Sequence, residues 1–496
     1  MAQEIPFIQN EKTDIEKFNE IEKKYRLYTE KLENIDFWMY SRFEIWLYIL
    51  SLCGKNTGQL HSSPKSAKDK LKTGILLLKN ILFGKRIRKG KKDLLILNHE
   101  RKVKNGDIYE CKYTECISWM YNNCYVFERP HNMGHLTPNN NRNLIYLDSI
   151  AVKGNLGYYR TKYFQKNKYK KLKGELREKL AMPVKEMERQ FGVDLDLEHM
   201  ISLAARKLLI CKSKRGSYEK IFQKISPKLV IEVVHYNMDC MIINEIARQK
   251  GIRTVELQHG SIHASHGAYH YDSDEPLNQL PDEIWLFSEY WKRSIRFPIG
   301  DDCLIPVGFP YFEEHVQECK KRYQKEQNRK AIVFISQWTI GKQMSSFAVE
   351  FAKLCADENI RILYKLHPGE TAGWKEKYQE LADCAQIEVI DSKDIDLYQL
   401  FAQSDIQAGV YSTAIFEGLG FGLGTYICDL PYADEMKNLY ENGYAKLVHR
   451  PEDLKAAVLG GSDTDMQGHR FWKEDSLKVI TERINRILQA DNGLPE

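Results

Sequence analysis

The segment KLVIEVVHYNMDCMIINEIARQKGIRTVEL, residues 228–257, decides the fold class. It opens with a short apolar run, residues 228–234, that is typical of a buried strand. A stretch that favours helix, residues 240–250, follows and stops at Gly251, because glycine commonly ends helices. A second strand, residues 253–257, comes directly after it. This order predicts a β-α-β unit, the building block of a parallel sheet with helices on its faces.

Similar apolar runs recur along the chain and form two series, separated by stretches that favour helix. The other strands of the first series are predicted at residues 93–98, 125–127, 144–147, 282–287 and 304–310. Those of the second series are predicted at residues 331–335, 361–366, 387–390, 405–410 and 425–428. We therefore expect an α/β protein with two doubly wound, Rossmann-like lobes. The expected divisions are an N-terminal helical segment (1–92), an N-terminal acceptor lobe (93–312), a C-terminal nucleotide-donor lobe (313–470) and a C-terminal helix that packs back across the lobes (471–496).

Composition limits the function classes. The chain has 496 residues, a length that suggests two large lobes and an extra segment. Its formal net charge of +5 is small for this size and argues against a dedicated nucleic-acid binder. The 11 cysteines are scattered without C-x-x-C spacing, as expected in a reducing cytosol. Residues 1–24 lack the apolar core of a signal peptide, and no apolar run reaches the roughly 20 residues that span a bilayer. We expect a cytoplasmic protein.

The N-terminal region is rich in aromatic and basic residues. Residues 11–50 are predicted as one helix, and a second, residues 74–83, runs directly into the basic cluster of residues 85–92. The second helix could contact an anionic membrane at the inner face of the plasma membrane, or it could be a core helix with a solvated basic end. The basic stretch 153–180 is predicted as an exposed helix and loop. It could face the phosphates of a lipid-linked acceptor or be a solvated face.

Histidines follow the strand at residues 253–257. His259 would lie at the carboxyl end of this strand, where open α/β sheets bind ligands. A neutral imidazole there could take a hydroxyl proton near pH 7, or it could only tie down its own loop. His259, His263 and His266 have spacings that resemble metal ligands on a helix, but they lie in a predicted loop without an acidic residue or cysteine nearby. We expect no metal site.

In the second series, residues 410–422 (VYSTAIFEGLGFG) indicate a strand end that turns into a helix. Ser412 or Thr413 could cap this helix, and its first-turn N–H groups would attract a phosphate. Glu417 lies four residues after Thr413, on the same helix face, where a carboxylate could bind a ribose diol. The alternative is a capped helix with no ligand.

Further polar groups follow two other predicted strands of this series. Ser336 and Gln337 come after residues 331–335, and His367 comes after residues 361–366. Because parallel strand ends lie side by side, these groups should share a crevice with Ser412. His367 could donate a hydrogen bond to a leaving phosphate. It could instead be a turn histidine held by the proline that follows it.

Three motifs in this order, residues 258–260 (QHG), 366–368 (LHP) and 411–413 (YST) followed by Glu417, resemble those of two-lobed GT-B glycosyltransferases of bacterial surface polysaccharides. The clan concerned includes bacterial sialyltransferases, capsule Kdo transferases and CDP-glycerol glycerophosphotransferases. The resemblance covers about residues 93–448. It implies that His367, Ser412 and Thr413 bind the donor phosphates and that His259 is catalytic. The residue before His259 is glutamine where the glycerophosphotransferases favour tryptophan, and the acidic signature of sialyltransferases is absent.

The resulting hypothesis is a metal-independent, inverting glycosyltransferase that needs no cofactor. Its partners would be a CMP-, CDP- or UDP-sugar donor and a glycan or lipid-linked acceptor, with no nucleic acid. His259 would deprotonate the acceptor hydroxyl and His367 would help the nucleotide leave. The alternatives are a CDP-polyol phosphotransferase of teichoic-acid type, a nucleotide-sugar 2-epimerase, and a non-catalytic scaffold of a polysaccharide assembly complex.

Overall fold

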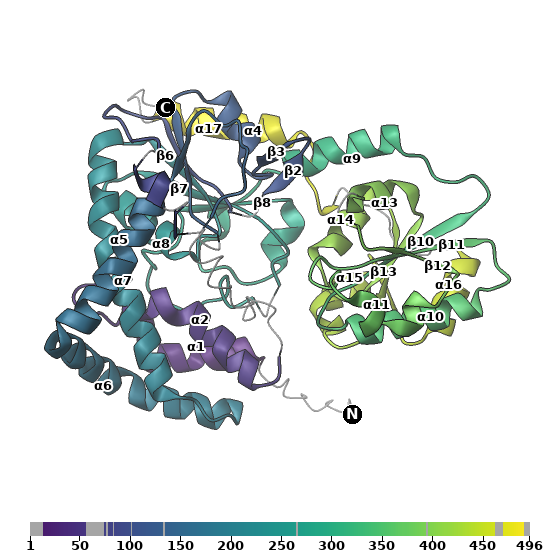
Figure 1. Cartoon of the computed structure of the whole chain (residues 1–496), viewed down its shortest axis with the longest axis horizontal. Helices are drawn as coiled ribbons and strands as arrows, with labels where there is room; N and C mark the ends of the chain where they lie inside the picture. Colours follow the sequence, from purple (N-terminus) through teal and green to yellow (C-terminus); the bar gives the residue numbers. More distant parts are fainter. Residues whose placement is uncertain are drawn as a thin grey trace, which may run out of the picture.

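The computed structural model describes residues 13–55, 74–75, 78–82, 84–100, 102–131, 134–263, 266–392, 395–461 and 470–490. Two lobes lie side by side, each built on a parallel sheet (Figure 1). Both lobes are Rossmann-like, with a mostly buried parallel sheet between helices, so the predicted fold class of two doubly wound α/β lobes is confirmed. The apolar strand sequences explain this fold, because parallel sheets are covered by helices on both faces and their strands are buried throughout.

The N-terminal sheet has seven strands in the order β5-β4-β1-β6-β7-β8-β9. Their bounds are Leu94–Leu97 (β1), Cys124–Glu128 (β4), Leu144–Tyr146 (β5), Leu229–Val233 (β6), Arg253–Leu257 (β7), Glu283–Leu286 (β8) and Leu304–Pro306 (β9). The predicted β-α-β unit is confirmed: β6 pairs in parallel with β7, with Leu229 opposite Arg253. The intervening helix α8 (Met238–Gln249) begins two residues earlier than expected, because Asn237 is its N-cap.

The C-terminal sheet has six parallel strands in the order β12-β11-β10-β13-β14-β15. They are Lys330–Ile335 (β10), Ile360–Lys365 (β11), Ile387–Ile390 (β12), Ile406–Gly409 (β13), Gly424–Cys428 (β14) and Lys446–Val448 (β15). The sequence analysis missed β15, a short edge strand. The helices are Gly341–Leu354 (α10), Trp374–Lys377 (α11), Gln379–Ala382 (α12), Leu397–Gln403 (α13), Thr413–Phe421 (α14), Ala433–Met436 (η5), Lys437–Glu441 (α15) and Pro451–Gly460 (α16).

The N-terminal segment corrects one prediction. Residues 11–50 do not form one helix: α1 (Asp14–Lys24), η1 (Leu27–Thr29) and α2 (Phe37–Leu52) are separate. The chain breaks at Arg26, Glu33 and Asn34, which adopt positive φ angles that no helix tolerates. Two tryptophans of α2 are buried in the same core as the helices beneath the N-terminal sheet. A second helix is predicted at residues 74–83. Residues 74–75 and 78–82 are helical, and residues 76, 77 and 83 lie outside the described residues.

Long helices cover the outer side of the N-terminal lobe. They are Asp148–Tyr159 (α5), a π-helical turn Arg160–Phe164 (η2), Lys166–Phe191 (α6) and Leu197–Ile225 (α7). Residues 153–180 are predicted to form an exposed helix and a loop. The helix is confirmed, but the loop is wrong, because the chain is almost continuously helical over this range. One face of α6 is buried through Leu172, Leu176 and Leu180, because leucines at spacings of four residues share a helix face.

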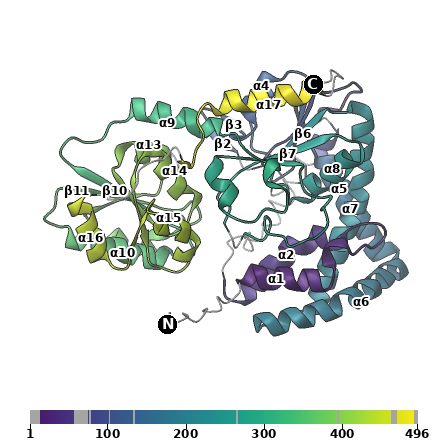
Figure 2. The same cartoon turned by 180° about the vertical axis from the view of Figure 1, so that it is seen from behind.

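The two lobes are joined twice. Helix α9 (Pro310–Arg322) leads from β9 into the C-terminal lobe, and α17 (Ser476–Ala490) returns to the N-terminal lobe (Figures 1 and 2). Arg483 of α17 contacts Glu283 of β8 at 2.9 Å. The remaining N-terminal elements are a hairpin of Val103–Asn105 (β2) and Ile108–Glu110 (β3), helix Glu115–Met120 (α4), and the short turns Glu289–Arg293 (η3) and Asp301–Cys303 (η4).

Candidate active site between the lobes

The lobes touch where the loop after β7 meets the first turn of α14. The backbone N–H of Ser261 donates to Thr413 Oγ1 over 3.1 Å. A Cβ added to Gly260 would lie 3.5 Å from the same oxygen, an ordinary contact distance, so Gly260 also lies beside Thr413. Nearby, His263 Nε2 lies 3.9 Å from Glu435 Oε2 of the C-terminal lobe. The loop that carries His259 and the helix that Ser412 caps are therefore neighbours in space.

His259 is held at both ring nitrogens. Tyr269 OH lies 3.3 Å from Nδ1 and donates its own hydrogen to Glu256 Oε1 over 2.7 Å. Because a hydroxyl has only one hydrogen to donate, Nδ1 of a neutral His259 is the donor toward Tyr269. The lone pair is then on Nε2, which lies 3.2 Å from Tyr236 OH. This is the tautomer that a general base requires, since Nε2 can accept a proton.

A buried ion pair lies beneath His259. His235 Nδ1 is 2.6 Å from Glu256 Oε2, and the His235 backbone N–H donates to Glu256 Oε1 over 3.0 Å. Burial disfavours both charges, but the Glu256 carboxylate raises the pKa of His235, and His235 in turn holds the pKa of Glu256 below its usual value. Glu256 Oε1 is also 3.8 Å from His259 Nδ1. A carboxylate at this position would stabilise His259 after it takes up a proton.

The first turn of α14 begins at Thr413. Ser412 is the N-cap, and its Oγ accepts a hydrogen bond from the Ala414 N–H over 3.1 Å. The N-terminal end of a helix carries partial positive charge and binds anions readily. Here that end faces the His259 loop, as the Ser261–Thr413 hydrogen bond shows. A phosphate bound at α14 would therefore lie close to His259.

Glu417 lies one turn further along α14, but its carboxylate is only 8% exposed. Tyr398 OH donates to Glu417 Oε1 over 2.9 Å. Burial raises the pKa of Glu417, and Lys112 and the Tyr398 hydrogen bond oppose this rise. The expected contact with a ribose would require the carboxylate to become more accessible than it is in this arrangement.

His367 is positioned by its own loop, which follows β11. The Gly369 N–H donates to Nδ1 over 3.1 Å, so Nε2 carries the hydrogen in the neutral ring and can donate to a ligand. The backbone N–H of His367 donates to the buried Glu370 carboxylate over 2.8 Å. Ser336 Oγ donates to the other oxygen of Glu370 over 3.0 Å. Ser336 is thus buried beneath the loop, where it supports His367 rather than facing the space between the lobes.

Gln337 connects two of the predicted strand ends. Its Nε2 donates to the Tyr411 carbonyl oxygen over 3.1 Å, directly before Ser412. Strand β10 pairs with both β11 and β13. The ends of these three strands, which carry Gln337, His367 and Ser412, are therefore adjacent, as the parallel-sheet argument predicts.

Lys112 is a site residue that the sequence analysis missed. Its Nζ lies 5.3 Å from the ring centroid of Tyr113 and 5.7 Å from that of Phe309. Burial disfavours its charge, but Tyr113 and Glu417 raise the pKa of Lys112, so it is a cation directed toward α14 of the other lobe. Tyr113 OH also donates to the His259 carbonyl oxygen over 2.6 Å. No motif marks Lys112, because only the fold of the β2–β3 hairpin brings it to the lobe junction.

Glu256 and Tyr269 were likewise not assigned a role from sequence. A glutamate within the apolar strand β7 was an available signal, since buried carboxylates are rare unless they are paired. His235, its partner, follows β6 in the same β-α-β unit. Their connection to His259 depends on side-chain contacts that no spacing in the sequence reveals.

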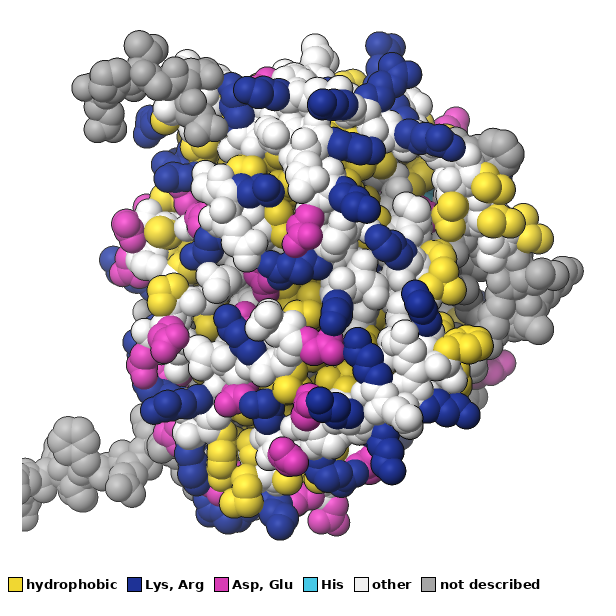
Figure 3. All heavy atoms as spheres, turned by 90° about the vertical axis from the view of Figure 1, so that its left-hand side faces the viewer, with side chains coloured by type: hydrophobic (Ala, Val, Ile, Leu, Met, Phe, Trp, Pro, Cys, Tyr) yellow, Lys and Arg dark blue, Asp and Glu magenta, His cyan; other side chains and the backbone are white. Residues whose placement is uncertain are grey.

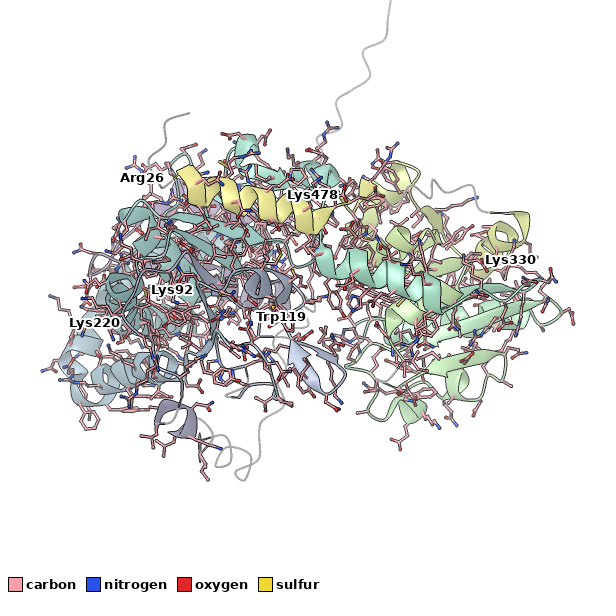
Figure 4. The ribbon with its side chains drawn as sticks, turned by 90° about the horizontal axis from the view of Figure 1, so that it is seen from above. Arg26, Lys92, Trp119, Lys220, Lys330 and Lys478 are labelled. Atoms are coloured by element: carbon pink, nitrogen blue, oxygen red, sulfur yellow. The ribbon has the colours of Figure 1, made fainter. Side chains whose placement is uncertain are left out.

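Hollows flank the lobe junction. One of about 870 Å³ is lined from both lobes by residues that include Tyr290, Arg293 and Asn438. It adjoins a small space beside Ser261 and Glu435, since the two have lining residues in common. Another, of about 1120 Å³, lies between α4, α9 and α17, whose flanks carry the labelled Trp119 and Lys478 (Figure 4). The first volume is in the range of small-molecule sites, and the second is slightly above it.

No helix among the described residues is both long and apolar enough to cross a bilayer. No group of three or more His, Cys, Asp or Glu side chains in the described ranges could hold a metal ion. Burial lowers the pKa of His263 to about 4, so this side chain is neutral near pH 7.

Comparison with known proteins gives a likeness of fold at low sequence identity. No family model and no curated protein matches the sequence. Among solved structures, UDP-GlcNAc 2-epimerase from Methanocaldococcus jannaschii is 12% identical, with a TM-score of 0.46, and the match covers 80% of this chain and 99% of that one. The wall teichoic acid polymerase TagF is 10% identical (TM-score 0.43; 87% and 100% covered). MurG from Acinetobacter baumannii is 12% identical (TM-score 0.38; 56% and 79% covered).

Proposed function

We propose that the protein is a GT-B glycosyltransferase that moves a sugar from a nucleotide-sugar donor to a hydroxyl group of a surface glycan or a lipid-linked acceptor. The observation that carries this proposal is the contact between the His259 loop and the first turn of α14. It brings His259, whose Nε2 carries the lone pair in the inferred tautomer, next to a helix end suited to a phosphate. The reaction would take place on the cytoplasmic side, at the inner face of the plasma membrane.

The chemistry follows from the two positions. His259 Nε2 takes the proton of the acceptor hydroxyl, and that oxygen attacks the anomeric carbon of the donor sugar. The bond between this carbon and the donor phosphate oxygen breaks, so negative charge grows on the leaving nucleotide. The N-terminal end of α14, the Thr413 hydroxyl, His367 Nε2–H and Lys112 would offset this charge. Attack from the side opposite the leaving group gives inversion, and no step requires a metal.

The residues beneath His259 have a supporting role in this scheme. When Nε2 is protonated, the ring becomes a cation that donates through Nδ1 toward Tyr269 OH, with the Glu256 carboxylate 3.8 Å away. The same arrangement would serve transfer of a polyol phosphate from a CDP donor. It would serve a nucleotide-sugar 2-epimerase less well, because that reaction has no acceptor hydroxyl to deprotonate.

The test is a nucleotide-binding panel followed by turnover measurements. The proposal predicts that one of CMP, CDP, UDP or GDP raises the melting temperature of the wild-type protein and that a His367→Ala variant loses much of this shift. With the matching donor, His259→Ala should lower kcat by about a hundredfold or more and leave nucleotide binding unchanged. Transfer of glycerol phosphate would favour the phosphotransferase, and conversion of the donor without an acceptor would favour the epimerase. No response to any nucleotide would favour the scaffold.

A further inference from the structure

An exposed hydrophobic row runs along α5 and η2, far from the lobe junction. Four side chains are largely open to solvent: Leu156 at 62%, Tyr159 at 46%, Tyr163 at 54% and Phe164 at 85% exposure. The spacing of Leu156, Tyr159 and Tyr163 puts them on one face of a helix. Tyr159 and Tyr163 are indeed stacked, with ring centroids 6.1 Å apart. Such a contiguous apolar patch on a protein surface usually marks an interaction site.

The sequence around this row is basic throughout. Residues 149–174 contain eight lysines and arginines and no aspartate or glutamate. Three of these lysines form ion pairs with carboxylates outside the stretch: Lys168 with Glu33, Lys171 with Glu175 and Lys173 with Glu198. Arg160, Lys166 and Lys170 are exposed and form no ion pair with a carboxylate of the described residues. The apolar row is therefore flanked by cations that are available to an external partner.

A second exposed row lies against the start of α5. The helical residues Ile75, Leu78 and Leu82 are 60%, 56% and 55% exposed, and their spacing again places them on one helix face. Asn80 of this helix donates to Asp148 of α5 over 3.3 Å. The exposures contradict a core position for these three side chains. Exposed hydrophobic side chains therefore lie near both ends of α5.

The space-filling view shows this outer side of the N-terminal lobe. Lysine and arginine side chains cover much of it, and hydrophobic side chains gather along one edge (Figure 3). In Figure 1 the same side carries α5, α6 and α7 and faces away from the C-terminal lobe. A partner bound there would leave the lobe junction open.

We propose that the α5–η2 surface, formed by Leu156, Tyr159, Tyr163 and Phe164 with Arg160, Lys166 and Lys170, docks the protein onto an anionic lipid bilayer. Tyrosine and phenylalanine side chains enter the boundary between headgroups and acyl chains, and lysine and arginine side chains bind anionic headgroups beside them. A bilayer fits the observations better than a nucleic acid, because the most exposed residue is a phenylalanine and the row includes an aliphatic leucine. The inference adds a binding surface and does not depend on the proposed chemistry.

The experiment measures binding of the full-length protein to vesicles by co-sedimentation. Vesicles of phosphatidylcholine mixed with phosphatidylglycerol are compared with vesicles of phosphatidylcholine alone. Wild-type protein should sediment with the anionic vesicles only, and added salt should weaken the binding. Equal binding to both kinds of vesicle, or to neither, would overturn the proposal.

Matched variants assign the binding to this surface. Tyr163→Ser/Phe164→Ser and, separately, Lys166→Gln/Lys170→Gln should each reduce the vesicle partition coefficient by about tenfold or more. The controls are Trp119→Ser, which removes an aromatic side chain that is 63% exposed on another face, and Lys375→Gln/Lys377→Gln in the C-terminal lobe. All four variants change exposed residues only, so melting temperatures should stay near that of the wild type.

The outcomes separate this proposal from the proposed function. If both α5–η2 variants bind vesicles like the wild type, or if the controls lose as much binding, the docking surface is wrong. If the variants instead lose binding to single-stranded RNA while vesicle binding is unchanged, the partner is a nucleic acid and the proposal also fails. Nucleotide binding should be equal in the wild type and the two α5–η2 variants. A failure of the chemistry would change that measurement alone.

Discussion

Tyr269→Phe tests the arrangement that makes His259 a base. The variant removes the hydroxyl that donates to Glu256 over 2.7 Å and accepts from His259 Nδ1 at 3.3 Å, while the buried ring remains. Without this acceptor, nothing at the Tyr269 position selects the tautomer whose Nε2 carries the lone pair. General-base catalysis contributes about 10²–10⁴-fold. Because the imidazole is retained and only its orientation and tautomer are weakened, we expect kcat to fall by roughly tenfold to a hundredfold.

The stability cost of this variant can also be worked out. Tyr269 loses one hydrogen bond to a charged group, which is worth about 1.5–3 kcal/mol. Tyr218→Phe is the matched control, because Tyr218 is also buried and donates to a carboxylate, Asp239, over 2.8 Å. Both variants should unfold at a similarly lowered denaturant concentration, but only Tyr269→Phe should lose kcat.

The assay is steady-state turnover with the donor found in the nucleotide panel, combined with donor titration and urea unfolding. For Tyr269→Phe, the KM of the donor should stay within about twofold, since Tyr269 does not touch the phosphate region in the proposed scheme. Unchanged kcat for Tyr269→Phe, or an equal loss of kcat in Tyr218→Phe, would refute the tautomer argument.

Three further predictions concern the rest of the site and its scaffold. His367→Ala should raise the donor KM about tenfold or more, a loss of at least about 1.4 kcal/mol of binding, and a wild-type KM would remove His367 from the donor site. Gly420→Ala should destabilise the protein by about 1–3 kcal/mol, because its Cβ would lie 2.5 Å from an aromatic ring carbon. Gly216→Ala, a helical position with nothing within 4 Å, should instead be neutral or stabilising by up to about 1 kcal/mol. Equal unfolding midpoints for the two glycine variants would contradict this. The pair of His235 and Glu256 makes stability depend on pH. Because the pKa of His235 is raised on folding, its contribution to stability is fully present below about pH 6.5 and is lost as pH rises through the folded pKa. Because the pKa of Glu256 is lowered on folding, its contribution is present above about pH 4.3 and is lost as pH falls through the folded pKa. A His235→Gln variant should lose the alkaline part of this dependence, and an unaltered profile from urea unfolding at a series of pH values would count against the ion pair.

The sequence by itself determined the class of fold. Short apolar strands separated by helices can bury their side chains in only one common way, as parallel sheets covered on both faces. It also determined the polar strand ends, because a motif such as residues 410–413 carries its own cap and helix start. The break between α1 and α2 could not be predicted from the sequence. Arg26, Glu33 and Asn34 adopt positive φ angles there, and none of them is a glycine, the residue type that usually indicates such a conformation.

Tertiary structure alone decided which of the polar groups face the lobe junction. Ser336 and Glu417 are polar like Thr413, yet burial and hydrogen bonds within the C-terminal lobe occupy them, whereas Thr413 accepts a hydrogen bond from Ser261 of the other lobe. Lys112, in contrast, is brought to the junction by a hairpin that carries no motif. The physical reason is that hydrogen bonds and ion pairs form between residues far apart in the chain. The packing of sheets, hairpins and lobes determines which of these residues come into contact, and a local sequence pattern does not predict that packing.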